Sequence, residues 1–365
     1  MSPRVLFLIS GLGLGNSTRC LAVIQRQADA GAVVEVATSD NGLWFFRDRG
    51  NDIAGLTPLP GLRYGQRDGR ISIAATLAAA RRMGDALRRA DGIVSGTIAR
   101  FRPHAVVSDS VYAFRAVRRA GLPLAAINNA DMVVRAMAGR RAPAAVLPQF
   151  LAVELPDFLF HRTIPDLVIS PRLDPADRVQ AGPFRAVPPI VRRECVPKGD
   201  IAAPPRRVAV MLSGSVFGSP VALTRPVPEG LAIDVIGRPA PPGPARPGVA
   251  YHGRVRDAAA LLRDADLVVV NGGFSAVSEA VALRRPVVVV PVPGHAEQWV
   301  NADTVARMGV GMAAAEDRLE EAMHDALGRL DAFRSAYGRL PAWAGEGAAH
   351  AARLILELAR GGAAR

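Results

Sequence analysis

The chain has 365 residues, of which 50% are hydrophobic, and this is enough for two domains of ordinary size. Its two cysteines offer no disulfide framework, and no apolar run reaches the roughly 18 residues that span a bilayer, so we expect a cytosolic protein. The 45 basic and 33 acidic residues give a net charge of +12, but the basic residues are scattered and aromatic residues make up only 5%, which argues against nucleic-acid binding. Attraction to phosphorylated substrates or anionic lipids fits the charge better, and a compositionally biased surface is the alternative.

The first predicted element is a strand over residues 5–9, which leads into the glycine turn GLGLGN (residues 11–16). A dinucleotide-binding turn has the pattern G-x-G-x-x-G, and Asn16 stands where its third glycine should fall. Asp40, near the end of the second predicted strand, could still bind a ribose, so an oxidoreductase is a disfavoured alternative. The N-terminal segment could be mistaken for a signal peptide, but the glycine turn and the amphipathic segment that follow it favour a first strand.

Strand-like and helix-like segments alternate along the first half of the chain and again along the second. This alternation predicts parallel sheets with helices on both faces. A proline-rich stretch divides the halves, so we predict a first domain over residues 1–184, a linker over 185–205, a second domain over 206–340 and a terminal helix over 341–365. In the first half the expected strands are 5–9, 33–37, 105–108, 124–127 and 167–169, and the expected helices are 18–30, 71–101 and 112–120.

One apolar stretch of the first half, AVLPQFLAVELPDFLF (residues 145–160), is bracketed by basic residues. Arg140 and Arg141 precede it, and His161 and Arg162 follow it. A patch of this kind on the surface could touch an anionic bilayer at the inner face of a membrane. The alternative is an ordinary core or interdomain segment.

The second half contains a strand followed by a glycine turn. Residues 266–271 (DLVVVN) have the apolar, β-branched composition of a buried parallel strand. Gly272 and Gly273 end this strand, and a helix follows that is entered through Ser275. Such an arrangement makes an anion site, because unpaired amides and the positive end of the helix dipole point at the turn. Glu279 lies four residues after Ser275 and therefore on the same side of the helix.

A further predicted strand, residues 287–291, ends before Gly294 and is followed by His295, Glu297 and Gln298. Open α/β sheets bind ligands outside the carboxyl ends of their strands, so these side chains and the glycine turn should line one crevice. Amides for phosphate, a carboxylate for a ribose diol and an amide for sugar hydroxyls together indicate a nucleotide-sugar site.

The segments GGFSAVSEA, PVVVVPVP and EQWVNA, with Gly309 and Gly311 beyond them, resemble the donor-binding half of the two-domain (GT-B) glycosyltransferases. The nearest group contains the lipid-linked N-acetylglucosaminyltransferase of peptidoglycan synthesis and the UDP-glycosyltransferases. The resemblance covers residues 206–313 well and the first 130 residues more loosely. It implies an α/β fold of two Rossmann-like, doubly wound domains that face a cleft, and a terminal helix that crosses back to the first domain.

The resemblance also implies a reaction, the inverting transfer of a sugar from a UDP-sugar donor to an acceptor hydroxyl that can be lipid-linked. The sequence shows no Asp-x-Asp pattern for a metal-bound diphosphate and no cluster of histidines with metal-ligand spacing, so we expect neither a metal nor a cofactor. The amides at residues 273–275 should hold the diphosphate. The remaining donor residues are expected to lie close to the bound nucleotide-sugar. Glu279 would bind the ribose diol, and Gln298, with Glu297 and His295 beside it, would bind the sugar hydroxyls. Ser215 of LSGS and Arg185 of GPFR would lie near the diphosphate.

The general base is the part of the resemblance that does not carry over. Related transferases commonly use a histidine after the first glycine turn, and here that position is Asn16, whose amide does not accept a proton near neutral pH. Asp109, at the end of AVVSD, and Asp131, in INNAD, are therefore the candidate bases, since a partly desolvated carboxylate has a raised pKa. Each of the two could instead cap a helix, and Asn16 could orient the acceptor or cap the helix behind it.

Two functions of other classes stay open. One is a nucleotide-sugar hydrolase of the same architecture, which needs a base that activates water and no acceptor pocket. The other is a catalytically silent nucleotide-sugar binding protein, which Asn16 favours. Release of UDP without an acceptor separates the first from a transferase, and binding without turnover identifies the second.

Overall fold

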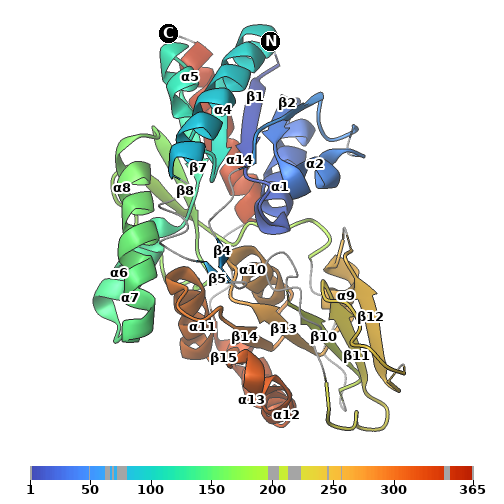
Figure 1. Cartoon of the computed structure of the whole chain (residues 1–365). Coiled ribbons are helices and arrows are strands. Elements are labelled where there is room, and N and C mark those ends of the chain that lie inside the picture. The colour runs from blue at the N-terminus through green and yellow to red at the C-terminus, as the bar shows by residue number, and fades with distance from the viewer. Residues whose placement is uncertain are drawn as a thin grey trace.

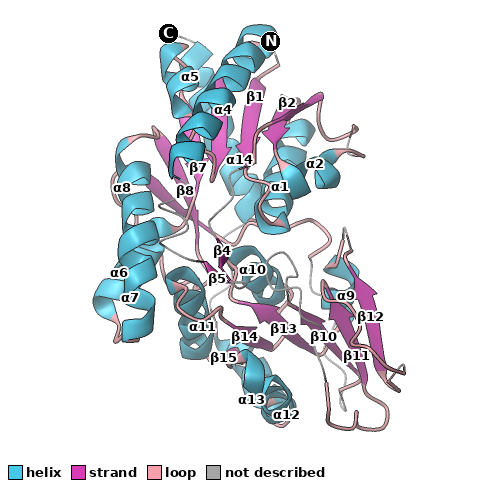
Figure 2. Ribbon diagram, viewed as in Figure 1, coloured by secondary structure: helices cyan, strands magenta, loops and turns pink. Residues whose placement is uncertain are grey.

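The computed structural model describes residues 2–48, 50–61, 66–67, 70–71, 80–195, 205–212, 223–244, 246–255, 257–340 and 346–363. It consists of two halves, each a parallel sheet between helices (Figures 1 and 2), and the predicted fold class is confirmed. The first sheet has the order β3-β2-β1-β6-β7-β8-β9, with β1 (Arg4–Ile9), β2 (Val33–Thr38), β3 (Gly55–Pro58), β6 (Ala105–Asp109), β7 (Leu124–Ile127), β8 (Leu167–Pro171) and β9 (Phe184–Val187). The second has the order β12-β11-β10-β13-β14-β15, with β10 (Arg207–Met211), β11 (Ala232–Ile236), β12 (Val249–Gly253), β13 (Leu267–Asn271), β14 (Val287–Val290) and β15 (Gly311–Ala313).

Helices follow most of these strands. Those of the first half are α1 (Leu14–Asp29), α2 (Asp40–Phe46), α4 (Ala80–Phe101), α5 (Phe114–Arg119), α6 (Ala130–Gly139), α7 (Leu147–Gln149), a π-helical turn (Phe150–Glu154) and α8 (Leu155–Thr163). Those of the second half are α9 (Ala259–Asp264), α10 (Phe274–Ala282), α11 (Ala296–Met308), α12 (Leu319–Leu327) and α13 (Leu330–Arg339), before the terminal helix α14 (Gly347–Ala363). The two short strands β4 (Gln66–Arg67) and β5 (Arg70–Ile71) pair with each other in antiparallel fashion. Among the described helices, none is long and apolar enough to cross a membrane.

Strand β1 shows why the strands of the first sheet are apolar throughout. Val5, Phe7 and Ile9 pack with buried residues of α1 and α14 on one face of the sheet. Leu6 and Leu8 pack with buried residues of α4 and α5 on the other face. Because helices cover both faces, the strand has no solvent-facing side and needs no polar residues.

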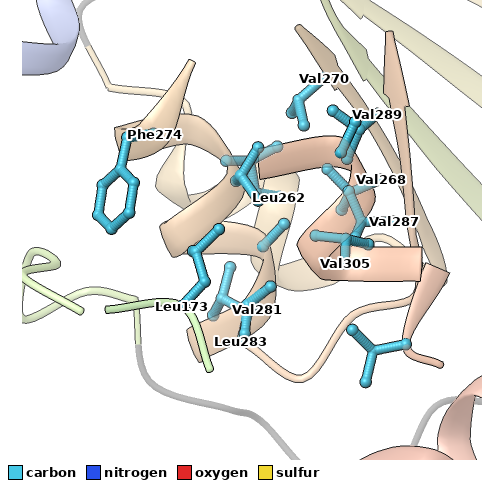
Figure 3. Close-up of a cluster of buried hydrophobic side chains, with 14 of the residues drawn as sticks. Leu173, Leu262, Val268, Val270, Phe274, Val281, Leu283, Val287, Val289 and Val305 are labelled. Carbon is cyan, nitrogen blue, oxygen red and sulfur yellow. The ribbon is translucent and has the colours of Figure 1, made fainter. Parts of the chain in front are cut away.

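The core of the second half is shared with the first. Val268 and Val270 of β13 point into a cluster with α9, α10 and α11, as Figure 3 shows, while Leu267 and Val269 point to the opposite face and pack with α12 and α13. Leu173, from the segment after β8, reaches the first of these clusters. Residues of α6 also belong to it, so the halves meet through apolar packing as well as through polar contacts.

The carboxyl ends of the two central strands face the junction between the halves. Helix α1 follows β1 and helix α10 follows β13, and residues of the two helices contact each other. In each sheet the strand order reverses beside the central strand, between β1 and β6 and between β10 and β13. Such switch points are where doubly wound sheets bind their ligands.

Helix α14 returns to the first half and packs against α1. Arg26 of α1 forms an ion pair with Glu346, directly before α14. A Cβ atom at Gly347 would lie 2.2 Å from the carbonyl oxygen of Pro188, so a glycine is required where the terminal helix begins against the linker.

Some element bounds differ from the prediction. Helix α1 begins at Leu14 rather than at residue 18, because Gly13 with extended backbone already serves as its N-cap. Strand β9 extends the first sheet to Val187, past the predicted domain end at residue 184. The expected helix 71–101 is described as α4 from Ala80 onward, and residues 196–204 of the predicted linker lie outside the described residues.

Candidate active site

The predicted donor site begins at the turn between β13 and α10. A Cβ atom at Gly272 would lie 2.7 Å from the Cβ of Gln298, so a glycine here lets α11 approach the turn. Asn301 of α11 fixes the turn, because its side-chain amide donates to the Gly272 carbonyl oxygen at 2.8 Å. Gly273 is the N-cap of α10 and makes no side-chain cap, which leaves the first amides of the helix for a ligand.

The glycine turn of the first half lies directly against this one. The Ser275 hydroxyl donates to the Gly15 carbonyl oxygen at 3.0 Å, and a Cβ atom at Gly15 would lie 3.2 Å from that hydroxyl. Gly13, the N-cap of α1, likewise makes no side-chain cap. Two helix N-termini without side-chain caps therefore converge between the halves (Figure 1), where the positive ends of both dipoles attract an anion.

Glu279 is buried in α10 and is bound by an arginine of the predicted linker. Arg192 Nε and Nη2 donate to the two Glu279 oxygens at 2.9 and 3.0 Å, and Arg192 Nη1 donates to Asp257 at 2.6 Å. Burial lowers the pKa of Arg192, but Glu279, followed by Cys195 and Asp257, outweighs it and raises that pKa, so the guanidinium stays charged. The structure thus adds Arg192 and Asp257 to the predicted site.

His295, Glu297 and Gln298 lie at the start of α11, beyond the carboxyl end of β14. The Gln298 side-chain oxygen accepts a hydrogen bond from the Val292 amide at 2.9 Å, which fixes the amide group and leaves its NH2 for another acceptor. Glu297 Oε1 accepts a hydrogen bond at 3.3 Å from Asn129, which belongs to the first half. This edge of the donor site is therefore closed by the other half of the molecule.

Two more residues of the first half meet the start of α11. The Gln149 side-chain oxygen accepts from the Ala296 amide at 2.9 Å, and its NH2 donates to Glu154 Oε1 at 2.8 Å. Burial, and then the charge of Glu297, raise the pKa of Glu154 to about 8, while burial lowers the pKa of His295. A ring nitrogen of His295 and one carboxylate oxygen each of Glu154 and Glu297 lie within 4.8 Å of one another, and among the described residues this is the group that could hold a metal ion.

Asp109, the first candidate base, ends β6 and is fully buried. Arg19 donates to both of its oxygens, from Nε at 3.0 Å and from Nη2 at 2.7 Å, and the Cys20 thiol donates to it at 3.3 Å. A buried carboxylate with both oxygens engaged has no access to an acceptor hydroxyl, so this geometry goes against Asp109 as the base and makes it the partner of Arg19. Asn16 is partly exposed and lies one turn before Arg19 on the same side of α1.

Asp131, the second candidate base, lies in the first turn of α6. It accepts hydrogen bonds from Ser170 at 2.6 Å, from Arg172 at 2.6 and 3.1 Å, and from Arg135 at 2.9 Å. Burial raises the pKa of Asp131, but Arg172 and the other donors outweigh it and lower that pKa. A carboxylate with a lowered pKa and four donors is unsuited to act as a base, so the structure goes against this assignment too.

Of the two predicted phosphate ligands outside the glycine turn, the one that the structure describes, Arg185, is not brought to the site. Arg185 is exposed on the edge strand β9, and its guanidinium donates to the carbonyl oxygens of Gly182 and Phe184 at 2.8 and 3.1 Å. Ser215 lies outside the described residues. The linker arginine that reaches α10 is Arg192, seven residues after Arg185.

A small pocket of the first half opens beside the glycine turn, at the carboxyl ends of β1, β2 and β6. Ser10, Ser39, Ser110 and Tyr112 supply its polar lining. Ser110 has a φ of 57°, and non-glycine residues with such strained backbone are found preferentially at functional sites. The pocket is therefore a candidate place for part of a second substrate.

Comparison with known proteins agrees with this geometry. The model of glycosyl transferase family 1 matches residues 3–154 and 252–330, which is more than half of the chain, so the protein belongs to this family. An uncharacterized glycosyltransferase from Methanosarcina acetivorans is 25% identical over 367 residues, which cover 94% of each chain.

Solved structures share the fold. The glycosyltransferase VinC in complex with dTDP is similar with a TM-score of 0.59 and 15% identity, over 98% of this chain and 99% of that one. MurG from Acinetobacter baumannii is similar with a TM-score of 0.56 and 16% identity, over 97% of this chain and 99% of that one. The predicted GT-B fold and glycosyltransferase class are thereby confirmed.

Proposed function

We propose that this glycosyltransferase moves a sugar from a UDP-sugar to an acceptor hydroxyl with inversion, and that its donor diphosphate needs no metal ion. The contact between Ser275 and Gly15 carries the proposal, because it brings two helix N-termini from the two halves to one point. Such N-termini bind phosphate through amides and dipoles, which supply the positive charge that a cation would otherwise provide. The complex of VinC with dTDP supports a nucleoside diphosphate in a fold of this kind.

The donor would lie along the second half. The amides after Gly273 would hold the diphosphate and stabilise the charge that grows on the leaving oxygen as the sugar departs. Glu279 would accept hydrogen bonds from the ribose diol. A carboxylate has about four acceptor positions, so the two bonds from Arg192 orient Glu279 and still leave room for the diol. The NH2 of Gln298, with Glu297 beside it, would meet the sugar hydroxyls.

The acceptor would approach from the first half, over the side of α1 that carries Asn16 and Arg19. Asn16 would orient the acceptor hydroxyl through its amide. Asp109 would act indirectly, because it holds Arg19 in place through two hydrogen bonds. Inversion is proposed on the resemblance to the UDP-glycosyltransferases.

Calorimetric titration with UDP, dTDP, ADP and GDP in the presence of EDTA tests the donor assignment. UDP should bind, and the absence of binding by every one of these nucleotides would contradict the proposal. UDP-sugars are then incubated without an acceptor. Slow release of UDP is expected of a transferase, rapid release would identify a hydrolase, and binding without turnover over a panel of acceptors would identify a silent binding protein.

We further propose that the acceptor is lipid-linked and that the first half touches an anionic membrane surface. Large apolar side chains are exposed along one stretch of α7, the π-helical turn and α8, and exposed arginines flank it. These are Leu147, Leu151, Val153 and Leu159, which are 38–59% exposed, with Arg141 and Arg162. Apolar side chains beside basic ones are typical of surfaces that bind anionic bilayers.

A further inference from the structure

We propose that Glu154, His295 and Glu297 bind one divalent transition-metal ion that joins the two halves. Glu154 comes from the π-helical turn of the first half, and the other two residues come from the start of α11 in the second. Their ligand atoms lie within 4.8 Å of one another. Zinc bonds of about 2.0–2.2 Å place the ligand atoms of a tetrahedral site about 3.3–3.6 Å apart, so the three side chains must approach one another by up to about 1.5 Å to complete the site.

Neighbouring amides already orient both carboxylates. Gln149 accepts from the Ala296 amide through its side-chain oxygen, so its NH2 must point at Glu154, where it holds Oε1. Asn129 holds Oε1 of Glu297 in the same way. Within the part of the chain that the structure describes, the hydrogen bonds to these two carboxylates involve Oε1 alone, which leaves the second oxygen of each for a ligand. Outer partners of this kind are typical of metal sites.

The two carboxylates and the imidazole also favour a bound cation. Glu154 and Glu297 face each other across the junction, and among the described residues neither forms an ion pair with a basic side chain. His295 Nδ1 is buried without a hydrogen-bond partner, which a bound cation would supply. An imidazole with two carboxylates suits zinc and its neighbours better than magnesium, which prefers oxygen ligands alone.

Glu297 also stands beside the proposed site for the sugar hydroxyls, but none of the three ligands belongs to the amide cradle of the diphosphate, so Zn²⁺ binding is tested separately from UDP binding. Both cysteines are buried, and neither belongs to this group of ligands. Calorimetry with Zn²⁺ on the full chain, first freed of metal by a chelator, should show one site. His295→Asn and Glu297→Gln should each weaken it by at least about tenfold. Asparagine is a favoured N-cap residue, so α11 should remain intact in the first variant.

His324→Ala, at an exposed position of α12, is the matched control and should leave Zn²⁺ binding unchanged. Gln149→Leu retains all three ligands and should still weaken Zn²⁺ binding about 10- to 100-fold, because Glu154 loses its orientation. UDP binding should be equal with and without Zn²⁺, so a chain that binds Zn²⁺ but not UDP would refute only the proposed function. Wild-type protein that binds Zn²⁺ no better than His295→Asn would overturn the metal site.

Discussion

Replacement of Glu279 by alanine tests the donor site most directly. In the proposed complex this carboxylate accepts hydrogen bonds from the ribose diol. Hydrogen bonds to a charged group contribute about 1.5–3 kcal/mol. Since about 1.4 kcal/mol corresponds to a tenfold change in affinity, Glu279→Ala should weaken UDP binding about 10- to 150-fold.

The same substitution should also lower the free energy of unfolding. Glu279 and Arg192 are 6% and 4% exposed and are joined by hydrogen bonds of 2.9 and 3.0 Å. Removal of one partner of a buried ion pair costs about 3–5 kcal/mol, because the other charge remains buried. Asp257 stays bound to Arg192 at 2.6 Å, so we expect a loss near the lower end of this range, to be measured by urea denaturation.

Calorimetry with UDP separates the two effects when it is carried out where circular dichroism shows the variant to be folded. Glu279→Gln preserves the shape of the side chain and one acceptor oxygen, so its UDP affinity should be intermediate. Asp331→Ala also removes one negative charge from the second half, but its side chain is 94% exposed on α13, and UDP affinity should not change. A folded Glu279→Ala protein that binds UDP within twofold of wild type would refute the assignment of Glu279 to the ribose.

Glu154→Gln should change how stability depends on pH. The pKa of Glu154 is raised to about 8, so the folded chain retains a proton that the unfolded chain releases near pH 4.5. The wild type should therefore lose stability relative to the variant from about pH 5 to 9. Urea denaturation in chelator measures this, and free energies of unfolding that change in parallel with pH for the two proteins would contradict it. Leu151→Ser with Leu159→Ser should reduce co-sedimentation with anionic vesicles at low salt by about tenfold or more, and wild-type protein that stays in the supernatant would refute the membrane contact. Asp109→Asn should lower the free energy of unfolding by about 3–5 kcal/mol, because Arg19 loses its buried partner.

The fold and the donor turn could be predicted because their signals are local. Strands covered on both faces are apolar along their whole length, so segments such as residues 266–271 indicate buried parallel strands without knowledge of their neighbours. Gly272 and Gly273 interrupt such a strand directly before a helix, and that order alone specifies a helix N-terminus above the edge of a sheet. The positions of these glycines in the structure follow from the same short stretch.

The contacts between the halves could not be predicted, because they depend on how two separately folded sheets face each other. Arg192 stands in a proline-rich segment as one of many scattered arginines, and only the packing of that segment against α10 brings it to Glu279. Glu154 interrupts an apolar stretch 143 residues before Glu297, and no periodicity relates the two. The sequence does carry one weak signal. Glu154 is the single acid of the largely apolar residues 145–155, and a buried acid needs a polar partner.

Asp109 shows how a base and a partner in an ion pair can be told apart. A general base contributes about 10²- to 10⁴-fold to turnover, so if Asp109 were the base, Asp109→Asn would lose activity while its stability stayed close to wild type. The bidentate pair with Arg19 predicts the opposite order, in which stability is lost first. Arg19→Met combined with Asp109→Leu leaves no unpaired buried charge, so the double variant should be more stable than Asp109→Asn. Comparison of this double variant with the single variants Arg19→Met and Asp109→Leu gives the coupling energy of the pair. A stable but inactive Asp109→Asn protein would restore the role of base to Asp109.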